Sequence, residues 1–181
     1  MTTTLITHSA CLEHDTGAGH PERADRLRAV LEALDHDTFR ELDRREAPLA
    51  ELDALARVHD VMYVDTILGN VPSHGYVMVD GDTVMSPGSG EAALRAAGAV
   101  CAAVDAVLSG AADNAFCAVR PPGHHAEPGR AMGFCLFNNV AIGAQHARAK
   151  HRLTRIAVID FDVHHGNGTQ AAFENDPDLF Y

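Results

Sequence analysis

The chain has 181 residues, a formal net charge of -11 and a hydrophobic fraction of 46%. This composition excludes an intrinsically disordered chain, and the length suits one globular domain with a substantial core. The acidic balance argues against direct binding to nucleic acid, and no apolar run approaches the roughly 20 residues that span a membrane. We therefore expect neither nucleic acid nor a membrane among its partners.

The first residues have neither the basic region nor the apolar region that begins a secretory signal. We therefore expect the protein in the cytoplasm, where thiols stay reduced. The cysteines form no CxxC pair and no dense framework, so we expect four reduced core residues: Cys11, Cys101, Cys117 and Cys135.

In the first half of the sequence, short apolar runs that suit strands alternate with stretches of helical spacing. Residues 43–46 form a mixed charge cluster that indicates a solvated face, and residues 69–90 are rich in turn-forming residues, which is typical of a loop. The expected regular elements are a strand at 5–7, a helix at 22–34 with Pro21 in its first turn, and short helices within 52–68 around His59.

The second half continues this alternation with longer elements. We expect a helix at 91–108, a buried strand at 115–119, a second helix at 138–150 and a strand at 155–160. The last strand is a continuous apolar run, which is typical of a parallel strand covered on both faces. Strands that alternate with helices predict an α/β fold around a parallel sheet, and no linker divides the chain into two domains.

Two polar segments, at residues 120–126 and 160–168, each follow a predicted strand. In open α/β sheets, ligands bind at such strand ends. Because side chains alternate along a strand, Asp160, Asp162 and His164 should share one face. The sequence therefore predicts a polar site at this edge of the sheet.

Asp162 and His164 offer a carboxylate oxygen and an imidazole nitrogen to a divalent metal. This mixed set suits zinc, and also ferrous iron or manganese. A catalytic zinc takes three protein ligands and one water, so a third ligand must come from elsewhere. A single Asp-x-His is more often the polar start of a loop, but its combination with the adjacent His124 and His125 favours a site.

Four segments resemble the histone deacetylase family, which includes bacterial acetylpolyamine amidohydrolases and acetoin-utilisation proteins. They read Gly-His-Pro-Glu-Arg at 19–23, Arg-Pro-Pro-Gly-His-His-Ala at 120–126, Gly-Phe-Cys-Leu-Phe-Asn-Asn at 133–139 and Asp-Phe-Asp-Val-His-His-Gly-Asn-Gly-Thr at 160–169. The resemblance implies an α/β, arginase/deacetylase-like three-layer fold with a central parallel sheet, incomplete at its C-terminal side. Residues 1–181 would then be the N-terminal portion of a single deacetylase domain.

The resemblance also implies roles for particular residues. Asp162 and His164 match two of the three zinc ligands, and Asn167, where other members have aspartate, resembles the class II members. The remaining matches are the tandem histidines His124 and His125, their respective partners Asp160 and Asn167, the channel residues Gly133 and Phe134, and the rim residue Asp82.

These matches imply a zinc-dependent hydrolase that removes an acetyl group from acetyl-lysine or from an acetylpolyamine, with a metal-bound water as nucleophile. His125 is the better general base, because its amide partner Asn167 does not add the charge stabilisation that the Asp160 carboxylate gives His124. Zinc is the implied cofactor, with ferrous iron as the alternative and potassium as a structural ion. The exact substrate and the oligomeric state stay open, and an oligomer is compatible with the sequence.

The chain also departs from the family pattern. By resemblance, a third, aspartate ligand and an oxyanion-stabilising tyrosine should follow further along, and Tyr181 is too close to the metal motif to be that tyrosine. The expected sheet would also have an unpaired apolar edge. Two alternatives remain at this point: an arginase-like two-manganese ureohydrolase and a truncated, non-catalytic form.

Overall fold

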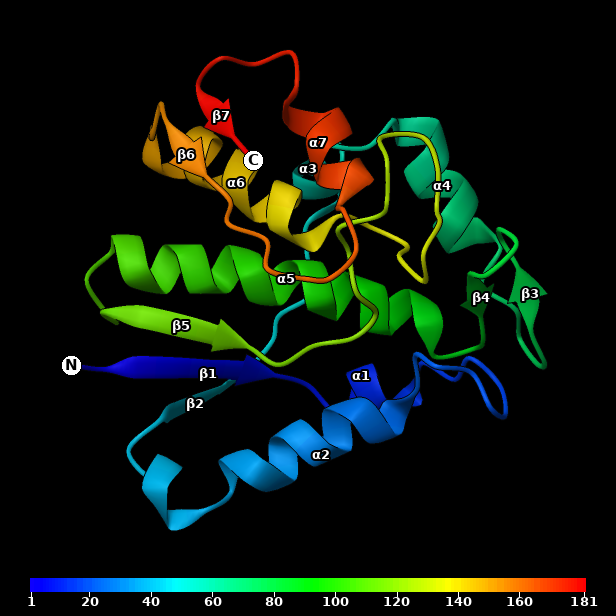
Figure 1. Cartoon of the computed structure of the whole chain (residues 1–181), viewed down its shortest axis with the longest axis horizontal. Helices are drawn as coiled ribbons and strands as arrows, with labels where there is room; N and C mark the ends of the chain where they lie inside the picture. The colour runs from blue at the N-terminus through cyan, green and yellow to red at the C-terminus, as the bar shows by residue number, and fades with distance from the viewer.

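A parallel three-stranded sheet lies near the centre of the fold (Figure 1). The computed structural model describes every residue from 1 to 181. The strands run in the order β2 (Asp43–Glu46), β1 (Thr3–Thr7) and β5 (Asn114–Cys117). Their register sets Leu5 of β1 between Arg44 and Phe116.

Helices cover both faces of this sheet, because side chains alternate between the faces along β1. Leu5 packs with Leu27 of α2 (Ala24–Leu34), while Ile6 packs with Ala99 of α5 (Ser89–Leu108). A further helix, α6 (Asn139–His151), packs against α5 on the side away from the sheet (Figure 1). The layered α/β arrangement agrees with the fold class expected from the sequence.

Shorter elements complete the fold. They are α1 (Ala10–Glu13), a 3-10 helix at Asp37–Phe39, α3 (Leu52–Leu55), α4 (Val61–Gly69), β3 (Val77–Met78), β4 (Val84–Met85), β6 (Ile156–Ala157), α7 (Asn167–Phe173) and β7 (Leu179–Phe180). β3 and β4 pair antiparallel, whereas β6 and β7 pair parallel, each pair as a separate sheet. No helix combines the length and the apolar character needed to cross a lipid bilayer.

The largest apolar core lies where α5 and α6 meet the α3–α4 region. Leu55, Met85, Phe137 and Ile142 are almost wholly buried there. The facing side of α5 carries alanines, which let these larger side chains approach the helix closely. Burial of one such side chain stabilises the fold by about 1.5–3 kcal/mol, so this core holds the two long helices together.

Two local predictions were wrong and one was confirmed. The predicted loop at 69–90 contains the β3–β4 hairpin. The charge cluster at 43–46 presents a solvated face as expected, and it does so from the edge strand β2, whose sequence therefore shows no apolar alternation. α2 begins at Ala24 with Arg23 as its N-cap, so Pro21 lies before the helix and not in its first turn.

The prediction of a doubly covered strand at 155–160 was also wrong. Only Ile156 and Ala157 form a strand, which pairs with β7 and not with β5. An apolar cavity of about 360 Å³ lies between β5 and β6, over α5 and α6. Ile159 is 76% exposed and Phe116 is 49% exposed, because no neighbouring strand covers them here.

All four cysteines are free thiols, three of them buried and Cys117 half-buried. Burial raises the pKa of Cys101 to about 11 and the pKa of Cys117 and of Cys135 to about 12. These thiols therefore stay protonated at neutral pH and act as small packing residues.

Candidate active site

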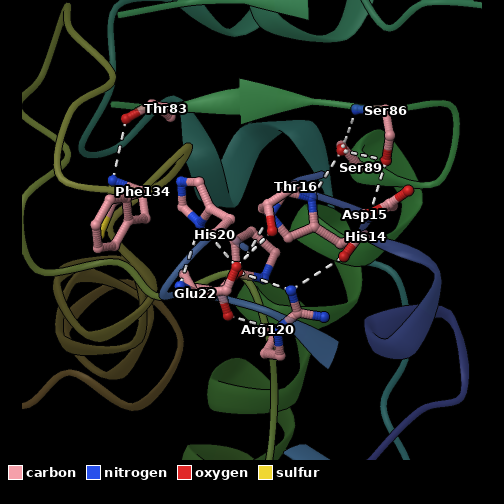
Figure 2. Close-up of polar contacts among 12 residues, drawn as sticks. His14, Asp15, Thr16, His20, Glu22, Thr83, Ser86, Ser89, Arg120 and Phe134 are labelled. Atoms are coloured by element: carbon pink, nitrogen blue, oxygen red, sulfur yellow. Dashed lines mark hydrogen bonds and ion pairs between the residues drawn. The ribbon is translucent and has the colours of Figure 1, made fainter. Parts of the chain in front are cut away.

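The buried side chain of Arg120 anchors the loop that carries the tandem histidines. Arg120 is 4% exposed, and its guanidinium pairs with both carboxylate oxygens of Glu22, which is 1% exposed (Figure 2). It also donates to the backbone oxygens of Cys11 and His14, at 2.9 and 3.0 Å. Because a buried charge without its partner costs about 3–5 kcal/mol, this pairing ties the segment around Glu22 to the end of β5.

His124 forms its hydrogen bond with a carboxylate. Its Nδ1 lies 2.8 Å from Oδ2 of Asp160, whose Oδ1 accepts from the backbone N–H of Asp162 at 3.0 Å. The hydroxyl of Tyr181 also donates to Oδ2, at 3.2 Å. Partial burial raises the pKa of Asp160, but the hydrogen bonds from His124 and Asp162 outweigh it, and the pKa falls below its ordinary value. Asp160 is therefore a charged partner at neutral pH.

His125 forms its hydrogen bond with an amide, and the hydrogen-bond network assigns its tautomer. Nδ1 of His125 lies 2.7 Å from Oδ1 of Asn167, whose Nδ2 lies 2.7 Å from Oε1 of Glu127. A carboxylate can only accept, so the NH₂ end of Asn167 faces Glu127 and its carbonyl end faces His125. Nδ1 of His125 therefore carries the proton, and the lone pair on Nε2 is free, as a general base requires.

Asp162 and His164 bring two potential metal ligands together. Oδ1 of Asp162 lies 3.0 Å from Nδ1 of His164, close to the roughly 3.3 Å between two ligands of one tetrahedral zinc. The two side chains are 49% and 73% exposed, so a metal could reach them from solvent. This oxygen and nitrogen fit zinc, but no third His, Cys, Asp or Glu ligand atom joins them within residues 1–181.

The predicted strand alternation is wrong for this segment, because residues 158–166 form no strand. The backbone N–H of His164 donates to Oδ1 of Asp162 at 2.8 Å, just as the backbone N–H of Asp162 donates to Oδ1 of Asp160. Such local bonds between an aspartate and the N–H two residues later are turns, not strand contacts. Phe161 and Val163 are accordingly 96% and 91% exposed.

Gly133 and Phe134 pack beside His125 in an unusual backbone conformation. Both have positive φ, of 57° and 69°, in the left-handed region that favours glycine. A Cβ added to Gly133 would lie 2.3 Å from Cδ2 of His125, so only glycine fits against this ring. The rings of Phe134 and His20 pack in a T-shaped arrangement, with centroids 4.8 Å apart and planes at 77° (Figure 2).

Asp82, on the β3–β4 hairpin, contacts Gly133 next to Phe134. Its Oδ1 accepts from the backbone N–H of Gly133 at 3.0 Å and from the hydroxyl of Thr83 at 2.8 Å. Thr83 Oγ1 in turn accepts from the N–H of Phe134 at 3.0 Å (Figure 2). The structure therefore brings Asp82, Gly133 and Phe134 together next to His125.

Sequence reasoning missed two residues that hold the site in place, Tyr181 and Glu127. The Tyr181 hydroxyl contacts Asp160 and accepts from the N–H of Gly166 at 2.7 Å. Because β6 and β7 are parallel, the residues that follow them reach the same edge, so a prediction of β7 would have placed Tyr181 here. Nothing in the sequence signals that Glu127 contacts Asn167.

The sequence model of the histone deacetylase domain matches residues 20–181. The chain belongs to the histone deacetylase family. It is 43% identical over 163 residues to the histone deacetylase-like amidohydrolase of Pseudomonas aeruginosa, an alignment that covers 90% of this chain and 43% of that protein. It is also 43% identical over 169 residues to the human polyamine deacetylase HDAC10, and this alignment covers 88% of this chain and 25% of that protein.

A solved structure confirms the expected histone deacetylase fold. The crystal structure of the HDA15 HD domain superposes with a TM-score of 0.91 at 34% sequence identity. The match covers 99% of this chain and 52% of that one. This member of the histone deacetylase family therefore spans about half the length of these relatives or less.

Proposed function

We propose that this histone deacetylase family member takes part in the zinc-dependent hydrolysis of an acetyl amide, on acetyl-lysine or on an acetylpolyamine. One observation supports this proposal most strongly: the adjacent imidazoles of His124 and His125 form hydrogen bonds to Asp160 and Asn167, respectively, beside the ring of His164. The names of two relatives, an amidohydrolase and a polyamine deacetylase, support an acetylated substrate. Residues 1–181 would supply the N-terminal portion of one deacetylase domain.

Asp162 and His164 would hold the metal through Oδ1 and Nδ1. When bound, zinc would lower the pKa of a water molecule and polarise the amide carbonyl. The third protein ligand would come from outside residues 1–181, since no third ligand atom lies near this pair. An oxyanion-stabilising hydroxyl would also come from outside, because Tyr181 is engaged with Asp160 and Gly166.

His125 is the residue that we assign to proton removal from the attacking water. Asn167 holds its Nδ1–H, so the Nε2 lone pair can accept the proton. His124 pairs instead with the Asp160 carboxylate, which favours a positively charged ring. His124 would therefore stabilise the negative charge that develops on the amide oxygen.

Gly133 and Phe134 would form part of the narrow channel for the aliphatic stem that carries the acetyl group. Asp82 is exposed beside these two residues, and its Oδ1 already accepts from Gly133 and Thr83. Oδ2 of Asp82 makes no hydrogen bond within the chain and is free to accept from a substrate N–H. This arrangement supports the assignment of Asp82 to substrate binding.

Three further properties also remain predictions. They are the choice of zinc over ferrous iron, a structural potassium ion held by backbone oxygens around Asp160, Asp162 and His164, and a cytoplasmic location. The family match favours deacetylation over the arginase-like ureohydrolase reaction. Metal analysis of the purified complete gene product would decide between zinc and iron.

The test compares variants of the complete gene product by acetate release and by zinc content. His125→Ala should lower acetate release from an acetylated lysine peptide and from an acetylpolyamine by about 10²–10⁴-fold, with zinc retained. Asp162→Ala should lose zinc and activity together. His74→Ala, at an exposed histidine outside the site, is the matched control. Near-normal turnover of His125→Ala would overturn the base assignment.

A further inference from the structure

A second group of metal-ligand side chains lies on α5 and α6. Nε2 of His146 and Nε2 of His151 lie 2.8 and 2.7 Å from the same oxygen, Oδ1 of Asp105. The three ligand atoms all lie within 4.8 Å of one another. No other group of three His, Cys, Asp or Glu residues in the chain is this close together. We propose that Asp105, His146 and His151 bind a divalent transition-metal ion of the zinc class, which joins the C-terminal ends of α5 and α6.

This cluster lies at the opposite end of the strands from the hydrolytic residues. Asp105 is in the last turn of α5, ahead of β5, and His151 ends α6, ahead of β6 (Figure 1). His124 and Asp160 instead follow the ends of β5 and β6. An ion bound at the cluster would therefore hold two helices together and take no part in hydrolysis, so the inference does not depend on the proposed function.

The chemistry of the three side chains suits zinc. Two imidazole nitrogens and one carboxylate oxygen are an established zinc donor set, and three protein ligands leave a position for water. The side chains of Asp105 and His151 are 53% and 26% exposed, so water can reach the open side. A bound ion would replace the two hydrogen bonds to Oδ1, because the coordinating Nε2 atoms must give up their protons.

The fold already holds these ligands close to the geometry that an ion requires. The side chain of His146 is 9% exposed and its Nδ1 is buried without a partner, so packing and the contact with Asp105 hold the ring in place. The rings of His146 and His151 are 6.2 Å apart at 64°, so they approach Asp105 from different directions. Ligands carried on packed helices are positioned more rigidly than ligands on loops.

The local charges favour a cation at Asp105. The hollow beside the cluster carries as many acidic as basic side chains: Glu51, Asp53, Arg57 and Lys150. The negative charge of Asp105 is therefore not cancelled by the surrounding residues.

The test measures zinc retained per chain after gel filtration, in a full chain that carries Asp162→Ala and His164→Ala. This background removes the other ligand pair, and we expect it to retain zinc and to gain thermal stability when zinc is added. Adding Asp105→Asn, which keeps the shape and one acceptor but removes the charge, should weaken zinc binding at least about tenfold and abolish the gain in Tm. His151→Gln should do the same at the exposed end of α6.

His74→Gln, an exposed histidine on another part of the surface, is the control and should leave zinc retention unchanged. Because His151 lies at a helix end, its variant tests the site even if Asp105→Asn weakens the packing of α5 and α6. The inference is overturned if the background variant retains no zinc, or if zinc retention and the gain in Tm survive both substitutions. The three residues would then be a hydrogen-bonded contact between helices and nothing more.

Discussion

Glu127 accepts a hydrogen bond from the side-chain amide of Asn167 at 2.7 Å, and this contact determines which end of the amide faces His125. We expect Glu127→Gln to disturb this order, because glutamine can also donate and lets the Asn167 amide turn over. The proton of His125 would then move to Nε2, and the base would be lost. In the complete gene product, kcat for acetate release should fall about tenfold or more while KM changes little.

Glu46→Gln is the matched control for this substitution, because Glu46 is exposed on the edge strand β2. It removes the same charge from a side chain that makes no hydrogen bond with the site residues and should leave kcat unchanged. Unchanged kcat in Glu127→Gln as well would show that the orientation of Asn167 does not depend on Glu127.

Asn167→Asp should change the pH dependence of hydrolysis. A carboxylate at this position would favour the charged form of the His125 ring, whereas the amide does not. The base would then become free only at higher pH, so the acidic limb of the kcat/KM profile should move upward by about one pH unit. A profile that stays in place would contradict the assignment of His125 as the group that takes the proton.

Gly133→Ala should reduce activity through the ring of His125. The new Cβ would lie 2.3 Å from Cδ2 of that ring and would displace it, and a displacement of about 1 Å can cost about 10²-fold in rate. Gly110→Ala is the matched control, because Gly110 has a φ of 76° but open space around it. Both variants should lose about 1–2 kcal/mol of stability, but only Gly133→Ala should lose activity. Equal activity in the two would refute the contact.

Two buried histidines should make the chain less stable in mild acid. Burial lowers the pKa of His14 and of His59 to about 4, from an ordinary value of 6.5. Between these two pH values the unfolded chain binds more protons than the folded chain, so the free energy of unfolding falls as the pH drops. Each histidine contributes up to about 1.4 kcal/mol per pH unit in this window.

Urea unfolding at several pH values between 4 and 6.5 measures this slope. His59→Gln should remove about half of it, since glutamine can still accept from the N–H of Asn138 and donate to the oxygen of Glu127 as His59 does. His36→Gln, at an exposed histidine, should keep the slope of the unsubstituted chain. A slope that His59→Gln leaves intact would mean that other groups cause the acid sensitivity.

The sequence was most informative where local chemistry and position coincide. Helical spacing placed α5 and α6 to within two residues at each end, and the polar segments after β5 and β6 do bring His124 next to Asp160. Motif residues carry strong local signals, because glycines, prolines and adjacent histidines constrain the backbone as well as the chemistry.

The remaining features depend on contacts between distant segments. The apolar run at 155–160 is typical of a strand buried on both faces. Such burial depends on neighbouring strands from other parts of a sequence, which the run itself does not reveal. Glu22 and Arg120 are separated by 98 positions, and no local pattern predicts that their charges are buried together. Tyr181 reaches Asp160 only because β7 pairs with β6. A strand of two residues is too short for the sequence to predict this pairing.

The most direct test of the central claim is acetate release by the complete gene product before and after removal of its metal. We predict that chelation abolishes hydrolysis of an acetylated lysine peptide and of an acetylpolyamine, that added zinc restores it, and that neither treatment affects an Asp162→Ala variant, which is inactive throughout. Full activity of the metal-free protein, or of the Asp162→Ala variant, would contradict metal-dependent hydrolysis at this site.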